Sequence, residues 1–315
     1  MSAPHSQAPR EGGAAPLRVA VTGSTGLIGA PLVRALRADG HRVLRLVRSR
    51  PVSGGDEVYW NPALGEIDTA ALEGVDAVVH LAGENVGQPP WTEDRKRRIM
   101  DSRVQGTTLI ARTLAGLSPR PRVLVSASAT GWYGDRGDEV LDESAPSGRG
   151  FLAEVCRAWE ASAEPARAAG IRVVHPRIGV VLAAEGGALE KLLTPFRLGV
   201  GGKLGTGKQW MSWVALHDVV EALRFALRAD GLAGPANLTS PAPATNEEFT
   251  RALGHVLGRP TVFSVPQFAL RLALGQMADE ALLASQRAVP DRLREAGFTF
   301  QYPDLDGALR VALGR

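Results

Sequence analysis

Residues 18–29 read RVAVTGSTGLIG, and this stretch decides the fold class. Its first half, Arg18 to Thr22, is a short apolar run typical of a buried strand. Three glycines then follow with the spacing GxxGxxG, which permits a tight turn, close approach of a pyrophosphate and close packing of the next helix. That helix, predicted from Leu27 to Asp39, presents free N–H groups to an anion. The stretch predicts a dinucleotide-binding loop formed by Gly23, Ser24, Thr25, Gly26, Leu27, Ile28 and Gly29.

The rest of the chain repeats this alternation of strand and helix. Apolar runs indicate further strands at 41–48, 75–83, 122–128, 171–177 and 235–240, and amphipathic stretches indicate helices at 92–114, 152–169 and 217–228. Such an order is typical of parallel strands joined by crossover helices. We therefore predict an α/β fold: a Rossmann-type doubly wound parallel sheet with a smaller, mostly helical C-terminal substrate lobe.

Three segments are expected along the chain. Residues 1–16 are rich in Pro, Gly and Ala and contain no apolar segment, which indicates a disordered tail and not a signal peptide. Residues 17–240 form the predicted NADP-binding Rossmann domain, in which 180–214 contributes to the substrate cleft. Residues 241–315 form the C-terminal domain, whose first helix is marked by a capping box of Thr245 and Glu248.

The composition of the chain indicates which kinds of partner molecule to expect. The 36 basic and 33 acidic residues leave a net charge of +3 over 315 residues, which does not indicate a nucleic-acid-binding face. No apolar run is long enough to span a bilayer. Cys156 is the single cysteine, and no His/Cys/Asp/Glu cluster has the spacing of metal ligands. We expect a cytoplasmic protein with a small-molecule substrate and without metal, nucleic-acid or membrane partners, and a homodimer is left open.

The end of the second strand indicates which dinucleotide is bound. A site for NAD usually has Asp or Glu there, to accept hydrogen bonds from the ribose 2′-hydroxyl. This sequence has Arg48 and Ser49 instead. A guanidinium pairs with a 2′-phosphate, so the predicted cofactor is NADP(H). The alternative is that Arg48 is only a solvated charge at a strand end.

Several motifs in order resemble a known family. The motifs TGSTGLIG, VVHLAG, VLVSASATGWYG and VALHDVV are similar to those of extended short-chain dehydrogenases/reductases of the nucleotide-sugar epimerase type. The stretches HLAGENV, FLAEVCRAWE and GGKLGTGKQWMSWV resemble more closely an atypical NADP-binding branch, the "epimerase family" proteins. The tail DRLREAGFTFQYPDLDGAL resembles the C-terminal domain of that branch. The resemblance implies an oxidoreductase or epimerase fold and leaves the substrate open.

The resemblance also implies roles for single positions. It places Ser128 where the family has its catalytic serine, and it puts Arg103 in place of a helix Asn, where we favour contact with the cofactor. It also places Leu81, Ala82 and Gly83 against the adenosine ribose and diphosphate of the cofactor. Pro176 and Ile178 are placed against the nicotinamide.

One departure from the family pattern affects the chemistry. Ordinary members have Tyr-x-x-x-Lys for proton transfer, whereas Leu152 and Cys156 stand at the aligned position. We take Tyr133 as the likeliest surrogate acid, to act with Ser128. Two functions remain open: an NADP(H)-dependent oxidoreductase or epimerase-like enzyme for a small hydroxyl or carbonyl substrate, which could be nucleotide-linked, and a non-catalytic NADP(H)-sensing or scaffold protein.

Overall fold

The computed structural model describes residues 15–51 and 55–315, so the predicted tail lies outside the described residues except for its last two positions. A nine-stranded sheet forms the centre, in the order β14-β9-β6-β5-β1-β2-β3-β4, with β7 paired to β9. All its pairs are parallel except β3 with β4. The strands are β1 (Arg18–Thr22), β2 (Arg42–Val47), β3 (Glu57–Asn61), β4 (Glu66–Ile67), β5 (Ala77–His80), β6 (Val123–Ser126), β7 (Ser128–Ala129), β9 (Arg172–Ile178) and β14 (Gly234–Leu238).

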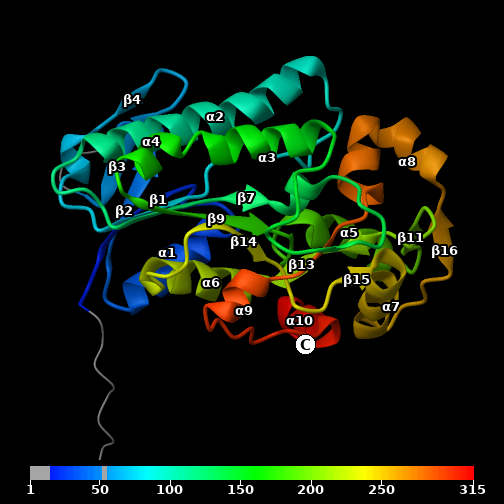
Figure 1. The fold of residues 1–315 in the computed structure, drawn as a ribbon. Coiled ribbons are helices and arrows are strands. Elements are labelled where there is room, and N and C mark those ends of the chain that lie inside the picture. The colour runs from blue at the N-terminus through cyan, green and yellow to red at the C-terminus, as the bar shows by residue number, and fades with distance from the viewer. Residues whose placement is uncertain (1–14, 52–54) are drawn as a thin grey trace, which may run out of the picture.

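Helices cover both faces of this sheet (Figure 1). One face carries α2 (Glu93–Gly116), α3 (Phe151–Ala161) and α4 (Glu164–Ala168), and the other carries α1 (Gly29–Ala38) and α6 (Leu216–Arg228). Each face has its own apolar core, because the strands bury side chains on both sides. The predicted Rossmann-type, doubly wound fold is therefore confirmed.

The C-terminal lobe packs around a third core. The capping box predicted at the start of its first helix is confirmed, since the side chains of Thr245 and Glu248 each accept a hydrogen bond at the N-terminus of α7. The helical elements outside the sheet layers are η1 (Ala70–Leu72), η2 (Thr130–Tyr133), α5 (Gly187–Arg197), α7 (Asn246–Leu257), α8 (Gln267–Leu274), the π-helical turn η3 (Ala278–Leu283), α9 (Asp291–Glu295) and α10 (Leu305–Ala312). The small sheets pair β10 (Val180–Leu182) with β13 (Trp213–Ala215), β11 (Gly202–Leu204) with β16 (Phe263–Val265), β12 (Trp210–Met211) with β15 (Ala244–Thr245), and β8 (Val140–Leu141) with β17 (Arg287–Ala288).

Two local expectations differ from the structure. The helix predicted over 152–169 is two helices, because Pro165 has no N–H to continue the ladder of α3. The strand β3 (Glu57–Asn61) was not predicted, although its side chains alternate between half-buried and buried positions as a sheet requires. It extends the sheet beyond β2.

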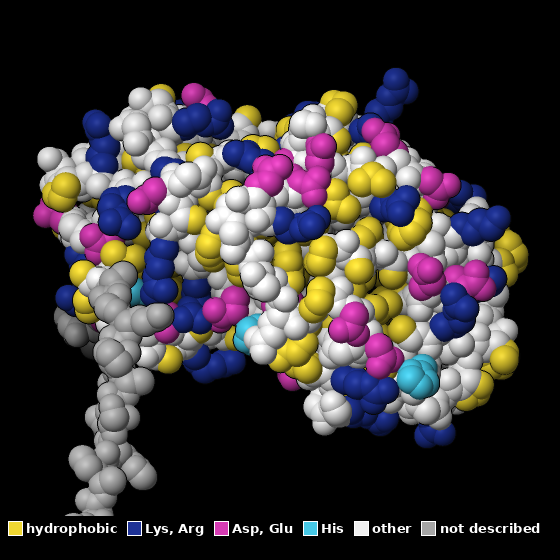
Figure 2. All heavy atoms as spheres, turned by 60° about the horizontal axis from the view of Figure 1, so that its bottom comes forward, with side chains coloured by type: hydrophobic (Ala, Val, Ile, Leu, Met, Phe, Trp, Pro, Cys, Tyr) yellow, Lys and Arg dark blue, Asp and Glu magenta, His cyan; other side chains and the backbone are white. Residues whose placement is uncertain are grey.

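The surface carries charges of both signs. Figure 2 shows Lys and Arg interspersed with Asp and Glu on the face that it presents, with no extended basic patch there. Among the residues that the structure describes, no helix combines the length and apolar character that crossing a bilayer requires.

Candidate functional site

The glycine-rich loop after β1 is folded so tightly that a side chain does not fit at its first or last glycine. Gly23 has a φ of +64°, and a Cβ on it would lie 3.0 Å from the backbone of Leu81 and Ala82. A Cβ on Gly29 would lie 2.1 Å from the carbonyl oxygen of Gly23. Gly26 is exposed at the tip, where its N–H donates to that same carbonyl at 3.0 Å. Glycine is therefore required here for backbone geometry and for close packing of α1.

The N-terminus of α1 is left open to an anion. Its first residues receive no side-chain cap, and the first turn contains no acidic residue. Thr25 is exposed beside Gly26, Leu27 and Ile28 are half-buried, and Ser24 is buried. The backbone N–H groups that helices leave unpaired at this end attract negative charge. The loop thus provides the cradle that a dinucleotide pyrophosphate needs.

A second wall of this cradle comes from the end of β5. The Thr22 hydroxyl oxygen accepts hydrogen bonds from the N–H groups of Leu81 and Ala82, at 3.0 and 3.1 Å. This contact holds the ends of β1 and β5 side by side. Arg103 reaches the next residue from α2, and its Cζ would lie 3.3 Å from a Cβ on Gly83. The structure therefore brings Leu81 and Ala82 next to the glycine loop and Arg103 against Gly83.

Arg48 and Ser49 lie at the carboxyl end of β2, and both are exposed. The neighbouring basic side chains are engaged: Arg45 pairs with Glu57 at 2.5 Å, and Arg50 lies 4.7 Å above the Tyr59 ring. In residues 15–51 and 55–315, no ion pair of Arg48 is formed. Its guanidinium is thus available at the edge of the sheet.

Pro176 and Ile178 lie at the carboxyl end of β9, on the other side of β1. Ile178 is half-buried and is paired with Ala129 of β7. The strands β2, β5 and β9 have their carboxyl ends at the same edge of the sheet. The predicted site residues therefore all lie at this edge, where ligands of such folds bind.

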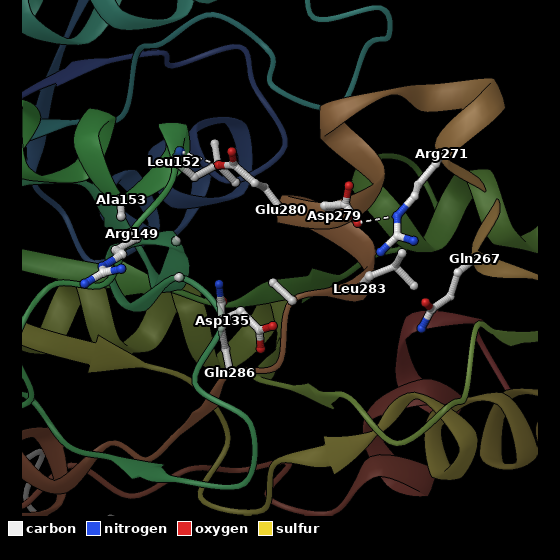
Figure 3. Close-up of a pocket in the computed structure, with 13 residues that line it drawn as sticks. Asp135, Arg149, Leu152, Ala153, Gln267, Arg271, Asp279, Glu280, Leu283 and Gln286 are labelled. Carbon is white, nitrogen blue, oxygen red and sulfur yellow. Dashed lines mark hydrogen bonds and ion pairs between the residues drawn. The ribbon is translucent and has the colours of Figure 1, made fainter. Parts of the chain in front are cut away.

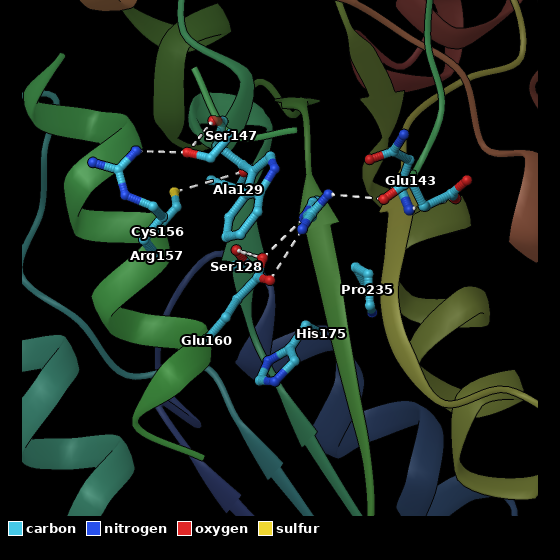
Figure 4. A network of polar contacts seen from close by, with 12 residues as sticks. Ser128, Ala129, Glu143, Ser147, Cys156, Arg157, Glu160, His175 and Pro235 are labelled. Carbon is cyan, nitrogen blue, oxygen red and sulfur yellow. Dashed lines mark hydrogen bonds and ion pairs between the residues drawn. The ribbon is translucent and has the colours of Figure 1, made fainter. Parts of the chain in front are cut away.

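Ser128 belongs to a buried polar network rather than to an open surface (Figure 4). Its Oγ donates to Oε1 of Glu160 on α3 at 2.7 Å. Arg177 of β9 holds the same carboxylate with two hydrogen bonds, from Nε at 2.9 Å and from Nη2 at 3.1 Å. Glu160 was not singled out in the sequence, because only the packing of α3 against β9 shows that it is paired. The hydroxyl proton of Ser128 is therefore occupied in the hydrogen bond to this carboxylate.

Tyr133 closes the other end of the network. Its ring is fully buried, and its hydroxyl donates to Oδ1 of Asn237 at 2.7 Å while it accepts from Nη1 of Arg177 at 3.1 Å. Burial raises the pKa of the phenol, an effect that Arg177 partly opposes. A proton donor must reach its substrate. This placement argues against the predicted surrogate acid and gives Tyr133 a supporting position behind Arg177.

Leu152 and Cys156 stand where ordinary family members have the Tyr and Lys of Tyr-x-x-x-Lys, and neither carries a charge here. Leu152 lines a cavity, and Cys156 is buried, with its thiol 3.6 Å from the carbonyl oxygen of Ala129. Burial raises the pKa of Cys156 to about 11. The thiol is therefore protonated at neutral pH and is not a nucleophile.

A cavity of about 290 Å³ lies at the carboxyl edge of the sheet, between the loop after β7 and the C-terminal lobe (Figure 3). Glu280 forms its inner wall: the carboxylate accepts hydrogen bonds from the N–H groups of Phe151 and Leu152, at 3.1 and 2.8 Å. On the outer wall, Arg271 of α8 pairs with Asp279 at 2.8 Å. The remaining lining residues are Gly131, Gly134, Asp135, Arg149, Ala153, Gln267, Leu283, Ala284 and Gln286.

The segment 180–214 supports this cavity from behind. None of the described residues that line this cavity belongs to the segment, so the expectation that 180–214 contributes to the substrate cleft stays a prediction. Gln209 instead donates to the carbonyl oxygen of Leu282 at 3.1 Å, and Ser212 donates to that of Gln286 at 2.8 Å. The sequence pattern contains no signal for Glu280 or Arg271, because their role depends on how the two lobes pack. No group of three potential metal ligands occurs among the residues described.

The doubly wound sheet, the glycine cradle and the cavity at the carboxyl edge define an NAD(P)-binding protein of the short-chain dehydrogenase/reductase type. Residues 19–237 match the model of the NAD dependent epimerase/dehydratase family, and residues 265–312 match a domain of unknown function, DUF1731. The chain therefore belongs to the NAD dependent epimerase/dehydratase family, and the resemblance to "epimerase family" proteins is confirmed.

Individual relatives cover nearly the whole chain. An epimerase family protein of Mycobacterium leprae is 46% identical over 94% of this chain and 96% of its own length. The chloroplastic SDR39U1 homolog of Arabidopsis thaliana is 40% identical over 94% of this chain and 87% of its own. Among solved structures, human SDR39U1 with NADPH has a TM-score of 0.85 and 31% identity, over 95% of this chain and all of the human chain. A nucleoside-diphosphate sugar epimerase from Corynebacterium glutamicum has a TM-score of 0.79 and 38% identity, over 95% of this chain and 59% of its own.

Proposed function

We propose that this protein binds NADP(H) and acts as an oxidoreductase or epimerase on a small hydroxyl or carbonyl compound that enters the cavity beside Leu152. The observation that carries the proposal is the uncapped N-terminus of α1 behind a loop that only glycine can form, at the same sheet edge as the cavity. The human relative was solved with NADPH, and the Corynebacterium relative is described as a nucleoside-diphosphate sugar epimerase. The first supports the cofactor, and the second supports a nucleotide-linked substrate.

The residues present fit a dinucleotide phosphate cofactor. Gly23 and Gly26 leave the room in which a pyrophosphate meets the N-terminus of α1, and Arg48 offers a cation for a 2′-phosphate. Leu81, Ala82 and Gly83 border the cofactor from β5, and Pro176 and Ile178 border it from β9. When bound, NADP(H) donates or accepts a hydride.

We expect NADPH to bind about ten- to a hundredfold more tightly than NADH, because a charge-assisted pair of Arg48 with the 2′-phosphate contributes roughly 1.5–3 kcal/mol. Titration of both cofactors by fluorescence measures this difference. Arg48→Ala should remove most of it.

Arg50→Ala is the matched control for this prediction, because Arg50 is also an exposed arginine at the end of β2 but is engaged with Tyr59. The control variant should keep the preference for NADPH. Equal affinities of the wild-type protein for NADPH and NADH would contradict the assignment of the cofactor.

Ser128, three residues before Gly131 in the cavity wall, is the side chain that we propose to meet the reacting group. Because its proton is donated to Glu160, its oxygen keeps lone pairs that can accept a hydrogen bond from a substrate hydroxyl. To donate a hydrogen bond to a substrate carbonyl, the Ser128 hydroxyl would have to turn away from Glu160. Arg177 holds Glu160 in place behind it, and Tyr133 in turn accepts a hydrogen bond from Arg177. Neither reaches the substrate in this arrangement.

The test is a panel of carbonyl compounds with NADPH and of alcohols with NADP⁺, followed by absorbance at the nicotinamide band. For any substrate that is turned over, Ser128→Ala should lower kcat by about 10²-fold or more. Ser126→Ala is the control, since Ser126 is a buried serine on β6 whose hydroxyl has no partner in the described structure.

The panel also separates the two functions that the missing Tyr and Lys leave open. Full activity of Ser128→Ala would show that Ser128 is not part of the chemistry. Tight binding of NADPH without turnover of any compound would favour the second candidate, a sensing or scaffold protein, which the burial of the Tyr133 hydroxyl also supports.

Two further properties stay predictions. A cytoplasmic location agrees with a single, buried cysteine that forms no disulfide, and cell fractionation tests it. A homodimer is tested by light scattering of the purified protein.

A further inference from the structure

Two arginine side chains are buried among the described residues, Arg103 and Arg177, and only one of them is neutralised. Arg177 pairs with Glu160 at 2.9 Å. Arg103 is 9% exposed and forms no ion pair in the described part of the chain. A buried charge without a counter-ion destabilises the fold, so a protein retains one chiefly where a ligand uses it.

Only one nitrogen of the Arg103 guanidinium donates hydrogen bonds to the described residues. Its Nη1 donates to the carbonyl oxygens of Glu84 and Ile99, both at 3.1 Å. The carboxylate of Glu84 does not pair with Arg103 but forms an ion pair with Arg95, whose Nη2 lies 3.5 Å from Oε1. Nε and Nη2 of Arg103 make no hydrogen bond to any described residue. Three of its five N–H donors are thus free for a ligand.

Two elements of the site contact this guanidinium. Gly83 lies against it, and the missing Cβ of Gly83 lets the guanidinium approach the turn after β5. The Trp159 ring of α3 also lies beside it, with its centroid 4.8 Å from Cζ. Burial lowers the pKa of Arg103, yet an arginine remains charged at neutral pH. A fixed positive charge therefore stands between β5 and α3.

Two neighbours decide which half of a dinucleotide this charge faces. Arg48 follows β2, on one side of β1, whereas Arg103 lies on the other side, between the turn after β5 and α3. The turn after β5 lies against the glycine loop and therefore borders the middle of the cofactor. Trp159, whose ring Arg103 contacts, precedes Glu160, which holds Ser128 at the proposed reacting group. If Arg48 meets the 2′-phosphate of the adenosine half, the contact with α3 places Arg103 toward the nicotinamide half.

We propose that Arg103 is the fixed cation of the nicotinamide half and that it makes the protein bind NADPH more tightly than NADP⁺. The two forms share their phosphates and differ by the positive charge of the oxidised ring. A nearby guanidinium repels that ring and leaves the neutral, reduced ring unaffected. This inference rests on the proposed NADP(H) binding and adds a discrimination between its two redox states.

The experiment compares dissociation constants of the two forms, measured by calorimetry without any substrate. We expect the ratio of Kd for NADP⁺ to Kd for NADPH to exceed one in the wild-type protein. Arg103→Met should lower this ratio by about three- to tenfold, the effect of one charge at several ångströms in partly hydrated surroundings. Arg103→Lys should keep most of it.

Arg48→Met is the matched control, because it removes an equal charge from the other half of the cofactor. It should weaken the binding of both forms by the same factor and leave the ratio unchanged. Equal losses for both forms in Arg103→Met would assign Arg103 to the shared phosphates and overturn the inference, and so would unchanged constants for both. If Arg103→Met does not fold by circular dichroism, Arg103→Gln replaces it.

The failure of this inference is distinguishable from that of the proposed function. If the wild-type protein binds neither form, both are overturned. If it binds NADPH and NADP⁺ with a ratio that no Arg103 variant changes, only the role of Arg103 is overturned.

Discussion

Valine in place of Gly26 is expected to abolish binding of NADP(H), with a loss of at least about 10²-fold in affinity. A branched side chain at the exposed tip of the loop occupies the space in which a pyrophosphate approaches the N-terminus of α1. The fold should survive, because a Cβ on Gly26 meets only the carbonyl oxygen of Gly23, at 3.3 Å, and its φ is not in the left-handed region. Cofactor titration and thermal unfolding on the same sample measure both effects.

Gly231→Val is the control for this variant, since Gly231 also has no positive φ and nothing lies within 4 Å of an added Cβ. It should bind the cofactor as the wild-type protein does. Undiminished binding by Gly26→Val would mean that the loop has only a structural role.

Methionine in place of Arg177 is expected to lower the free energy of unfolding by about 3–5 kcal/mol, because Glu160 would be left as a buried carboxylate without its cation. The side chain also loses its hydrogen bond to Tyr133 and its position 3.9 Å above the Trp132 ring. Urea unfolding followed by circular dichroism measures the change.

The same substitution at Arg294 provides the comparison. Arg294 is exposed and lies 3.8 Å from Asp291, and such surface pairs contribute about 0–1 kcal/mol. Arg103→Met should also cost little, because it removes a charge that no carboxylate neutralises. A loss below about 1 kcal/mol for Arg177→Met would show that the network of Ser128, Glu160 and Arg177 does not stabilise the fold.

Local signals predicted most of the fold. The strand Arg18–Thr22 and the capping box at Thr245 agree with the structure residue by residue, since each depends on neighbours within a few positions. The strand β3 and the break between α3 and α4 were not predicted. A short half-buried strand becomes visible only when a neighbouring strand pairs with it, and the proline ended a helix whose apolar pattern continued.

Part of the candidate site could likewise be predicted from local sequence, and part depends on the tertiary structure. The sequence by itself determined the glycine loop, because the backbone leaves no room for a Cβ at Gly23 and Gly29 wherever the chain turns in this manner. It could not show that Ser128 donates to Glu160, that Tyr133 meets Asn237 across 104 residues, or that Glu280 caps α3. Those contacts join distant segments, and only the packing of α3 and the C-terminal lobe against the sheet decided which buried polar groups were paired and that Arg103 was left without a counter-ion.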